Sequence, residues 1–283
     1  MSFSPRTGYI DLPVKLACGS CIGCRLDRSQ AWAVRVVHEA QFHPVNVFVT
    51  LTYRPKSLPP GGTLVKKDVQ DFLKRLRKWH GGRLSYFMCG EYGEQLSRPH
   101  YHLILFGVDF TDKTPWKKSS QGDQLYVSAT LERLWGHGFT SVGDCTFQSA
   151  AYCARYVMKK ITGDMAVDHY TRIDPDTGEV HQLQPEYLAA SLRPAIGKRW
   201  IEKYSTDVYP SDSCVVEGRE RRVPRYYDKR LAEASPEVYS KVRDARMRRA
   251  GRLKARANAA PERLAVREEV AHAKLLLLKR GLG

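Results

Sequence analysis

Two histidines separated by one residue are the first side chains in this sequence that could do chemistry. His100 and His102 lie in a run over residues 99–107 whose Leu-Ile-Leu-Phe continuation predicts a β-strand. Side chains at positions i and i+2 of a strand leave the same face of a sheet, so both imidazoles can reach one ligand. A same-face pair of histidines is more often hydrogen-bonded than metal-bound. The spacing nevertheless makes this pair a candidate metal site.

Glu91 is the carboxylate expected to lie nearest to the pair. It ends a strand predicted over residues 84–91, which should form a hairpin with the histidine strand and bring the carboxylate toward the same face. Glu94, in the intervening loop, is the alternative. Two imidazoles and one carboxylate suit Mn²⁺ or Mg²⁺ acting as a Lewis acid on a phosphodiester, and they do not exclude zinc.

A second set of reactive side chains is predicted on one helix. The helix expected over residues 147–161 carries Tyr152, Tyr156 and Lys159 at intervals of about one turn. Tyrosines one turn apart more often form a packing stripe. A phenolate can nevertheless attack a phosphodiester, and the resulting phosphotyrosine conserves the bond energy for rejoining. Lys159 could lower a phenol pKa or hold phosphate oxygens, or it could be an ordinary solvated lysine. We predict that the histidine and tyrosine faces meet.

The elements that must position these groups follow one another from residue 45. Strands are predicted over 45–53, 84–91, the histidine run and 139–142, with helices over 66–80, 128–135 and 147–161. The first six elements give an α+β fold with the ferredoxin-like order, an antiparallel sheet with two helices on one face. The other face is free, and the tyrosine helix can lie near it. Residues 109–124 are expected to form a polar surface loop.

Four segments are expected along the chain. They are a Cys-rich loop and helix at 1–44 with the helix running from Ser29 to His43, the core at 45–163, an accessory region packed on the core at 164–235, and a basic helical region at 236–283.

Three cysteines at regular spacing stand near the start of the chain. Cys18, Cys21 and Cys24 form a Cys-x-x-Cys-x-x-Cys run that can hold zinc, although structural zinc usually takes four ligands. Cys214 or a histidine could supply the fourth. The alternative is a set of reduced, partly buried thiols. The total of seven cysteines is odd, which argues against a disulfide framework.

The charge of the chain points to a polyanionic partner. Lys and Arg outnumber Asp and Glu by 46 to 30, giving a formal net charge of +16. Nucleic acid is therefore the first candidate. No stretch approaches the roughly 18 apolar residues of a membrane span, and no signal peptide is evident, so we expect a cytoplasmic protein. The sequence has no Walker A loop, so we expect a host helicase to unwind the DNA.

Three motifs in this order resemble those of the HUH endonucleases that initiate rolling-circle replication. They are Phe-Val-Thr-Leu-Thr-Tyr at 48–53, the His-Tyr-His at 100–102, and Tyr-x-x-x-Tyr-x-x-Lys at 152–159. The cysteine run, Cys-Gly-Glu-Tyr-Gly at 89–93 and Arg-Val-Pro-Arg-Tyr-Tyr-Asp at 222–228 are similar to the replication initiators of gokushovirus-type microviruses, which are small single-stranded DNA phages.

The resemblance implies an RRM-like HUH endonuclease fold and a two-tyrosine mechanism. The family's residues map onto His100, His102 and Glu91 as ligands of a divalent ion, onto Tyr152 and Tyr156 as nucleophiles, and onto Lys159 as the motif lysine. It further implies nicking of single-stranded origin DNA in the cytoplasm of a bacterial host, a covalent link to the 5′ phosphate, a free 3′ hydroxyl for host polymerase, and later rejoining.

Other interpretations of the same residues stay open. The strand could enter along Arg98, Lys159 and Lys160, with Tyr53, Tyr101 and Trp116 available for base stacking. An HUH transposase or relaxase would share the motifs. A non-catalytic nucleic-acid-binding module could use the same sheet, and a zinc-stabilised DNA-binding protein could rest on the cysteines. The oligomeric state is left open.

Overall fold

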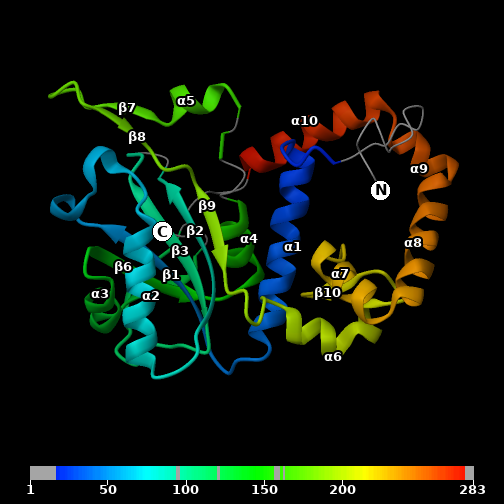
Figure 1. Cartoon of the computed structure of the whole chain (residues 1–283), viewed down its shortest axis with the longest axis horizontal. Helices are drawn as coiled ribbons and strands as arrows, with labels where there is room; N and C mark the ends of the chain where they lie inside the picture. Colours follow the sequence, from blue (N-terminus) through cyan, green and yellow to red (C-terminus); the bar gives the residue numbers. More distant parts are fainter. Residues whose placement is uncertain (1–16, 94–95, 120–121, 156–159, 162, 278–283) are drawn as a thin grey trace, which may run out of the picture.

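The structure is a computed structural model that describes residues 17–93, 96–119, 122–155, 160–161 and 163–277. The largest sheet in these residues has seven antiparallel strands in the order β4-β5-β6-β1-β3-β2-β9 (Figure 1). The bounds are β1 Asn46–Tyr53, β2 Ser85–Tyr92, β3 Pro99–Phe106, β4 Thr114–Lys118, β5 Gln124–Val127, β6 Gly138–Asp144 and β9 Tyr187–Ala190. The predicted α+β class is confirmed, and the four predicted strands form its centre.

One face of the sheet is covered by α2 (Lys66–His80) and α3 (Ala129–Trp135). Alternate residues of the strands, such as Leu51 and Leu103, pack with Phe72 of α2 and Trp135 of α3, and all four are fully buried. Both helices have the predicted bounds because their ends are fixed locally. Ser128 Oγ accepts the N–H of Leu131 at 3.1 Å, and Gly81 ends α2 with a φ of 74° that favours glycine.

The opposite face is covered by α1 (Ile22–Ala40) and α4 (Phe147–Arg155). Ala33 and Val36 of α1 and Cys153 of α4 pack against Phe48 and Ile104 of the sheet. The prediction that the first helix begins at Ser29 and runs to His43 was wrong at both ends, since the helix starts at Ile22 with Cys21 as its N-cap. Ser29 instead donates to Ala151 O and so joins α1 to α4.

The prediction of a surface loop over residues 109–124 was also wrong in part, because β4 lies within this run and pairs with β5. All five residues of β4 are exposed. No alternation of apolar and polar residues therefore marks the strand, and backbone pairing with β5 forms it. A register shift between Pro115 and Lys117 accommodates the proline.

The remaining elements lie beyond the core. They are 3-10 turns at Pro55–Ser57 and Pro60–Gly62, helices α5 Met165–His169, α6 Lys198–Val208, α7 Arg225–Ala234, α8 Pro236–Gly251, α9 Leu253–Asn258 and α10 Pro261–Leu277, and hairpins β7 Thr171–Ile173 with β8 Val180–Gln182 and β10 Cys214–Val216 with β11 Arg219–Arg221. A third core cluster joins α1, α6 and α7 through Val34, Ile201 and Tyr227. The C-terminal region is helical as predicted, and α8, α9 and α10 form an arm that returns to α1 (Figure 1). Within the described residues, no helix combines the length and the apolar character that a membrane span requires.

Candidate functional site

Two rows of polar side chains cross the sheet on the face covered by α1 and α4. They occupy β6, β1, β3 and β2 in turn. The first row is Phe139, Thr52, His100 and Glu91, and the second is Ser141, Thr50, His102 and Cys89. The predicted placement of His100, His102 and Glu91 on one face is therefore what the register gives, with Glu91 directly opposite His100.

His102 is held on both sides of its ring. Its Nδ1 lies 3.0 Å from Thr50 Oγ1, and its Nε2 lies 3.0 Å from Glu91 Oε1. His102 and Glu91 are only 2% and 4% exposed. The sequence reasoning missed Thr50, although a signal was present: Thr50 and Thr52 alternate with the apolar Val49 and Leu51 and so must face the histidine side.

His100 presents its other ring nitrogen to the site. Its Nδ1 donates to Arg98 O at 2.7 Å, which leaves Nε2 as the atom with a lone pair. Burial, reinforced by the neighbouring His102 ring, lowers the pKa of His100 below its usual value, so the neutral form predominates at pH 7. A Cβ on Gly93 would lie 2.8 Å from His100 Cε1, so this ring position requires a glycine in the loop.

The donor set of this centre fits a divalent ion. Two donors at right angles on an ion about 2.1 Å away are about 3 Å apart, which is the separation of His102 Nε2 and Glu91 Oε1. Among the described residues, the three-donor group whose atoms all lie within 4.8 Å of one another is the cysteine run. His100 therefore stands as a third, more distant donor beside a close His102–Glu91 pair.

Helix α4 brings Tyr152 onto His102. The two ring centroids are 5.2 Å apart with an interplanar angle of 79°, and Phe48 meets Tyr152 edge-on at 6.3 Å. Tyr152 is 8% exposed. The histidine and tyrosine faces thus meet at Tyr152, whereas Tyr156, Lys159 and the alternative ligand Glu94 lie outside the described residues.

The described part of the tyrosine helix is shorter than predicted, since it ends at Arg155, while Lys160 and Ile161 are not helical. Tertiary contacts account for this difference. Lys160 O accepts from the Arg25 guanidinium at 3.3 Å, and the Ile161 N–H donates to Tyr170 Oη at 3.1 Å. Side chains from α1 and the accessory region thereby take the place of helical partners.

Two of the three aromatics expected to stack on bases cannot do so. Tyr53 and Tyr101 point to the α2 and α3 face and are 1% and 0% exposed, so that prediction was wrong. Trp116 is 54% exposed on β4. Phe139, which the sequence reasoning did not single out, is 58% exposed in the same row as His100.

The cysteine run forms a second group of donors that can hold a metal ion. The thiol groups of Cys18, Cys21 and Cys24 lie within 4.8 Å of one another at the start of α1. The N–H of Cys21, followed by the hydroxyl of Ser20, lowers the pKa of Cys18 to about 6. Cys214 is buried in the third core cluster and does not belong to this group, so the structure does not support it as a fourth ligand.

Comparisons with known proteins agree with this geometry. A protein-family model of the replication-associated protein ORF2 type matches residues 46–161. The chain is 33% identical over 231 residues to the replication-associated protein VP4 of Bdellovibrio phage phiMH2K, covering 78% of this chain and 69% of that protein. It is 34% identical over 227 residues to the replication-associated protein ORF2 of Spiroplasma virus 4, covering 76% and 67%.

A third relative is more distant. The chain is 28% identical over 229 residues to the replication-associated protein ORF4 of Chlamydia phage 1, covering 75% of this chain and 52% of that protein. No solved structure matches the chain.

Proposed function

We propose that this chain, which belongs to the family of phage replication-associated proteins as its motifs predicted, initiates replication by nicking single-stranded DNA at an origin. The observation that carries the proposal is the contact of Tyr152 with His102, which is itself bonded to Glu91. A phenol, two imidazoles and a carboxylate on one sheet face suit phosphodiester cleavage by tyrosine attack.

The tyrosine side chain would supply the nucleophile. The Tyr152 phenol loses its proton and its oxygen bonds to phosphorus, while the bond from phosphorus to the 3′ oxygen of the preceding nucleotide breaks. That oxygen takes up a proton, which leaves a free 3′ hydroxyl and a 5′-phosphotyrosine. The burial of Tyr152 supports the later rejoining step, because exclusion of water protects the phosphotyrosine from hydrolysis. Tyr156 would be the second nucleophile and Lys159 would hold the phosphate.

His100, His102 and Glu91 would hold Mn²⁺ or Mg²⁺, which would supply positive charge to the phosphate oxygens. The surrounding chain prepares these ligands. Thr50 Oγ1 and Arg98 O bond the Nδ1 atoms of the two histidines and thereby orient both Nε2 atoms. In the host cytoplasm, a host polymerase would extend the 3′ hydroxyl and a host helicase would open the duplex.

The test is formation of a covalent adduct. Incubation with single-stranded DNA spanning the genome that encodes the protein, in the presence of Mn²⁺, should give a protein–DNA complex that survives SDS, and peptide mapping should place the nucleotide on a tyrosine. A circular unit-length product would separate a replication initiator from a transposase or relaxase. Binding of every fragment without any adduct would instead indicate a non-catalytic module.

Phe139 supports a path for the single strand beside the site. It lies two strands from His100 in the same row, about 10 Å away, and its ring is exposed. Base stacking on an aromatic contributes about 1–3 kcal/mol, so Phe139→Ala should weaken single-strand binding by about 5-fold to 150-fold in fluorescence anisotropy. Phe139→Tyr, which keeps a π face, should bind normally, and Phe139→Leu should not. Equal binding by the Leu and Tyr variants would exclude stacking.

The cysteine group is proposed to hold zinc. Three thiolates suit zinc, and the lowered pKa of Cys18 favours its thiolate near neutral pH. We expect purified protein to contain about one zinc per chain by mass spectrometry, and Cys21→Ser to lose it. Cys145→Ser is the matched control, because Cys145 is a thiol outside the group. Equal zinc content in the two variants would contradict the proposal.

A further inference from the structure

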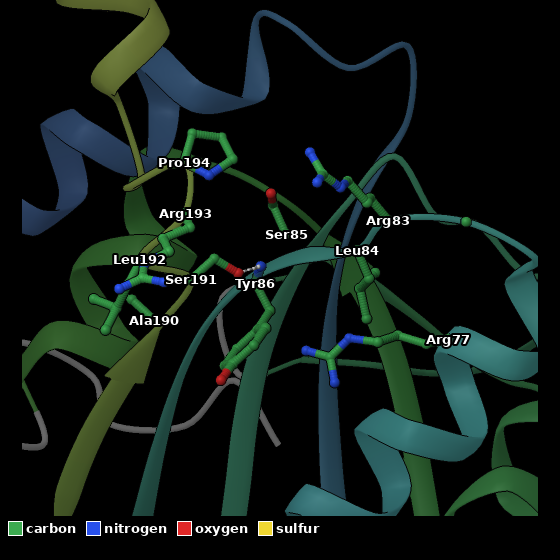
Figure 2. A pocket seen from close by; sticks show the side chains of 11 residues that line it. Arg77, Arg83, Leu84, Ser85, Tyr86, Ala190, Ser191, Leu192, Arg193 and Pro194 are labelled. Carbon is green, nitrogen blue, oxygen red and sulfur yellow. Dashed lines mark hydrogen bonds between the residues drawn. The ribbon is translucent and has the colours of Figure 1, made fainter.

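An open cavity of about 670 Å³ lies at the β9 edge of the sheet (Figure 2). Three segments form its walls: the loop that follows α2, the first residues of β2, and the end of β9 with the loop beyond it. Tyr86 in this cavity and Glu91 in the candidate site are five residues apart on β2, a distance of about 16 Å along a strand. The cavity is therefore separate from the proposed nicking centre.

Arginines dominate the charge of this cavity. Arg77, Arg83 and Arg193 line it and are exposed, and its lining residues, all within the described part of the chain, include no Asp or Glu. A guanidinium is always charged and its planar fork matches phosphate oxygens. The carbonyl end of α2 is also near, and its partial negative charge disfavours an anion, so the attraction must come from the side chains.

The remaining lining combines an aromatic ring with an apolar surface. In Figure 2, Arg77 extends from α2 toward Tyr86, and its Cζ lies 5.9 Å from the ring centroid. Ser191 Oγ accepts the N–H of Tyr86 at 3.0 Å, which leaves its hydroxyl hydrogen for another acceptor. Leu192 is 78% exposed. Cations, a hydroxyl donor, an aromatic ring and an apolar surface together are the chemistry that single-stranded nucleic acids bind.

We propose that this cavity binds phosphates of the DNA strand at nucleotides away from the nick. The inference rests on the proposed function for the identity of the ligand, and it gives the protein a second grip on the strand. Such a grip would keep the DNA in place between cutting and rejoining. A free nucleotide or inorganic phosphate has the same charged groups, and the experiment distinguishes these sources from DNA.

The test measures the salt dependence of binding to a single strand of about 40 nucleotides, long enough to reach both sites. The variant replaces Arg83 and Arg193 with Ala, and the matched control replaces Arg263 and Arg267, two exposed arginines of α10, so net charge is the same. Loss of two phosphate contacts should lower the slope of log K against log salt by about 1.4. The affinity deficit should accordingly narrow about sevenfold between 50 and 200 mM salt.

The outcomes separate this inference from the proposed function. A reduced slope in the cavity variant alone supports DNA binding there, whether or not the native protein forms an adduct. Equal slopes for the cavity variant and the control would overturn it. Binding of inorganic phosphate or a deoxynucleoside monophosphate that the cavity variant loses, with DNA binding unchanged, would make the cavity a small-anion site and would also overturn it.

Discussion

Replacing Tyr152 and Tyr156 together by phenylalanine should abolish the SDS-resistant protein–DNA adduct, with a loss on the order of 10³-fold or more. The change removes only the phenolic oxygens. The ring at position 152 can still pack against His102 and Phe48, so the α4 contact with the sheet should be retained. Gel electrophoresis after SDS treatment, using radiolabelled DNA, measures the adduct.

The controls for this experiment separate loss of the nucleophile from loss of fold. Tyr239→Phe, on α8 far from the sheet, should form a normal amount of adduct. The double variant should bind single-stranded DNA as tightly as the native protein. An adduct that persists in the double variant would show that neither tyrosine is the nucleophile. Each single variant then shows which of the two attacks first.

Replacing His100 by alanine should abolish Mn²⁺-dependent nicking while leaving DNA affinity unchanged within about twofold. Positive charge on the phosphate oxygens is worth several kcal/mol, so we expect a rate loss of about 10²-fold to 10⁴-fold. His100 is preferable to His102 for this test because His102 is fully buried between Thr50 and Glu91, and its removal would leave both without their partner. Single-turnover cleavage of the nicked strand gives the rate.

Two further variants sharpen this result. Glu91→Gln keeps the size of the side chain and removes its charge, so its cleavage defect should shrink as Mn²⁺ is raised, since a weaker site fills at higher concentration. His80→Ala, at the exposed end of α2, should cleave normally. Undiminished cleavage by His100→Ala would remove this residue from the proposed site.

The parts of the fold that could be predicted from the sequence are those whose signals are local. Helix α2 was predicted at its observed bounds because its apolar period and Gly81 are contiguous in the chain. The shared face of His100 and His102 follows from strand alternation alone. The phage replication family followed from three short motifs, and the comparisons confirm it.

The parts that could not be predicted depend on distant segments. Thr50 became a partner of His102 only through the register of β1 on β3. The end of α4 is set by Arg25 and Tyr170, which lie far from it in sequence. The arginine cavity joins the end of α2 to residues beyond β9, more than one hundred positions later, so no motif marks it.

Strand β9 has a consequence for the order in which the protein is made. Ala190 pairs with Phe87, 103 residues earlier, and Leu188 and Ile196 pack in the cluster beneath α1. A ribosome that has just passed residue 161 has therefore translated every motif of the proposed nuclease, but β2 still lacks its outer neighbour and the cluster is incomplete. An unfinished chain would carry the chemistry without the scaffold. A phage that must not cut DNA at random thus gains a nuclease that matures only late in translation.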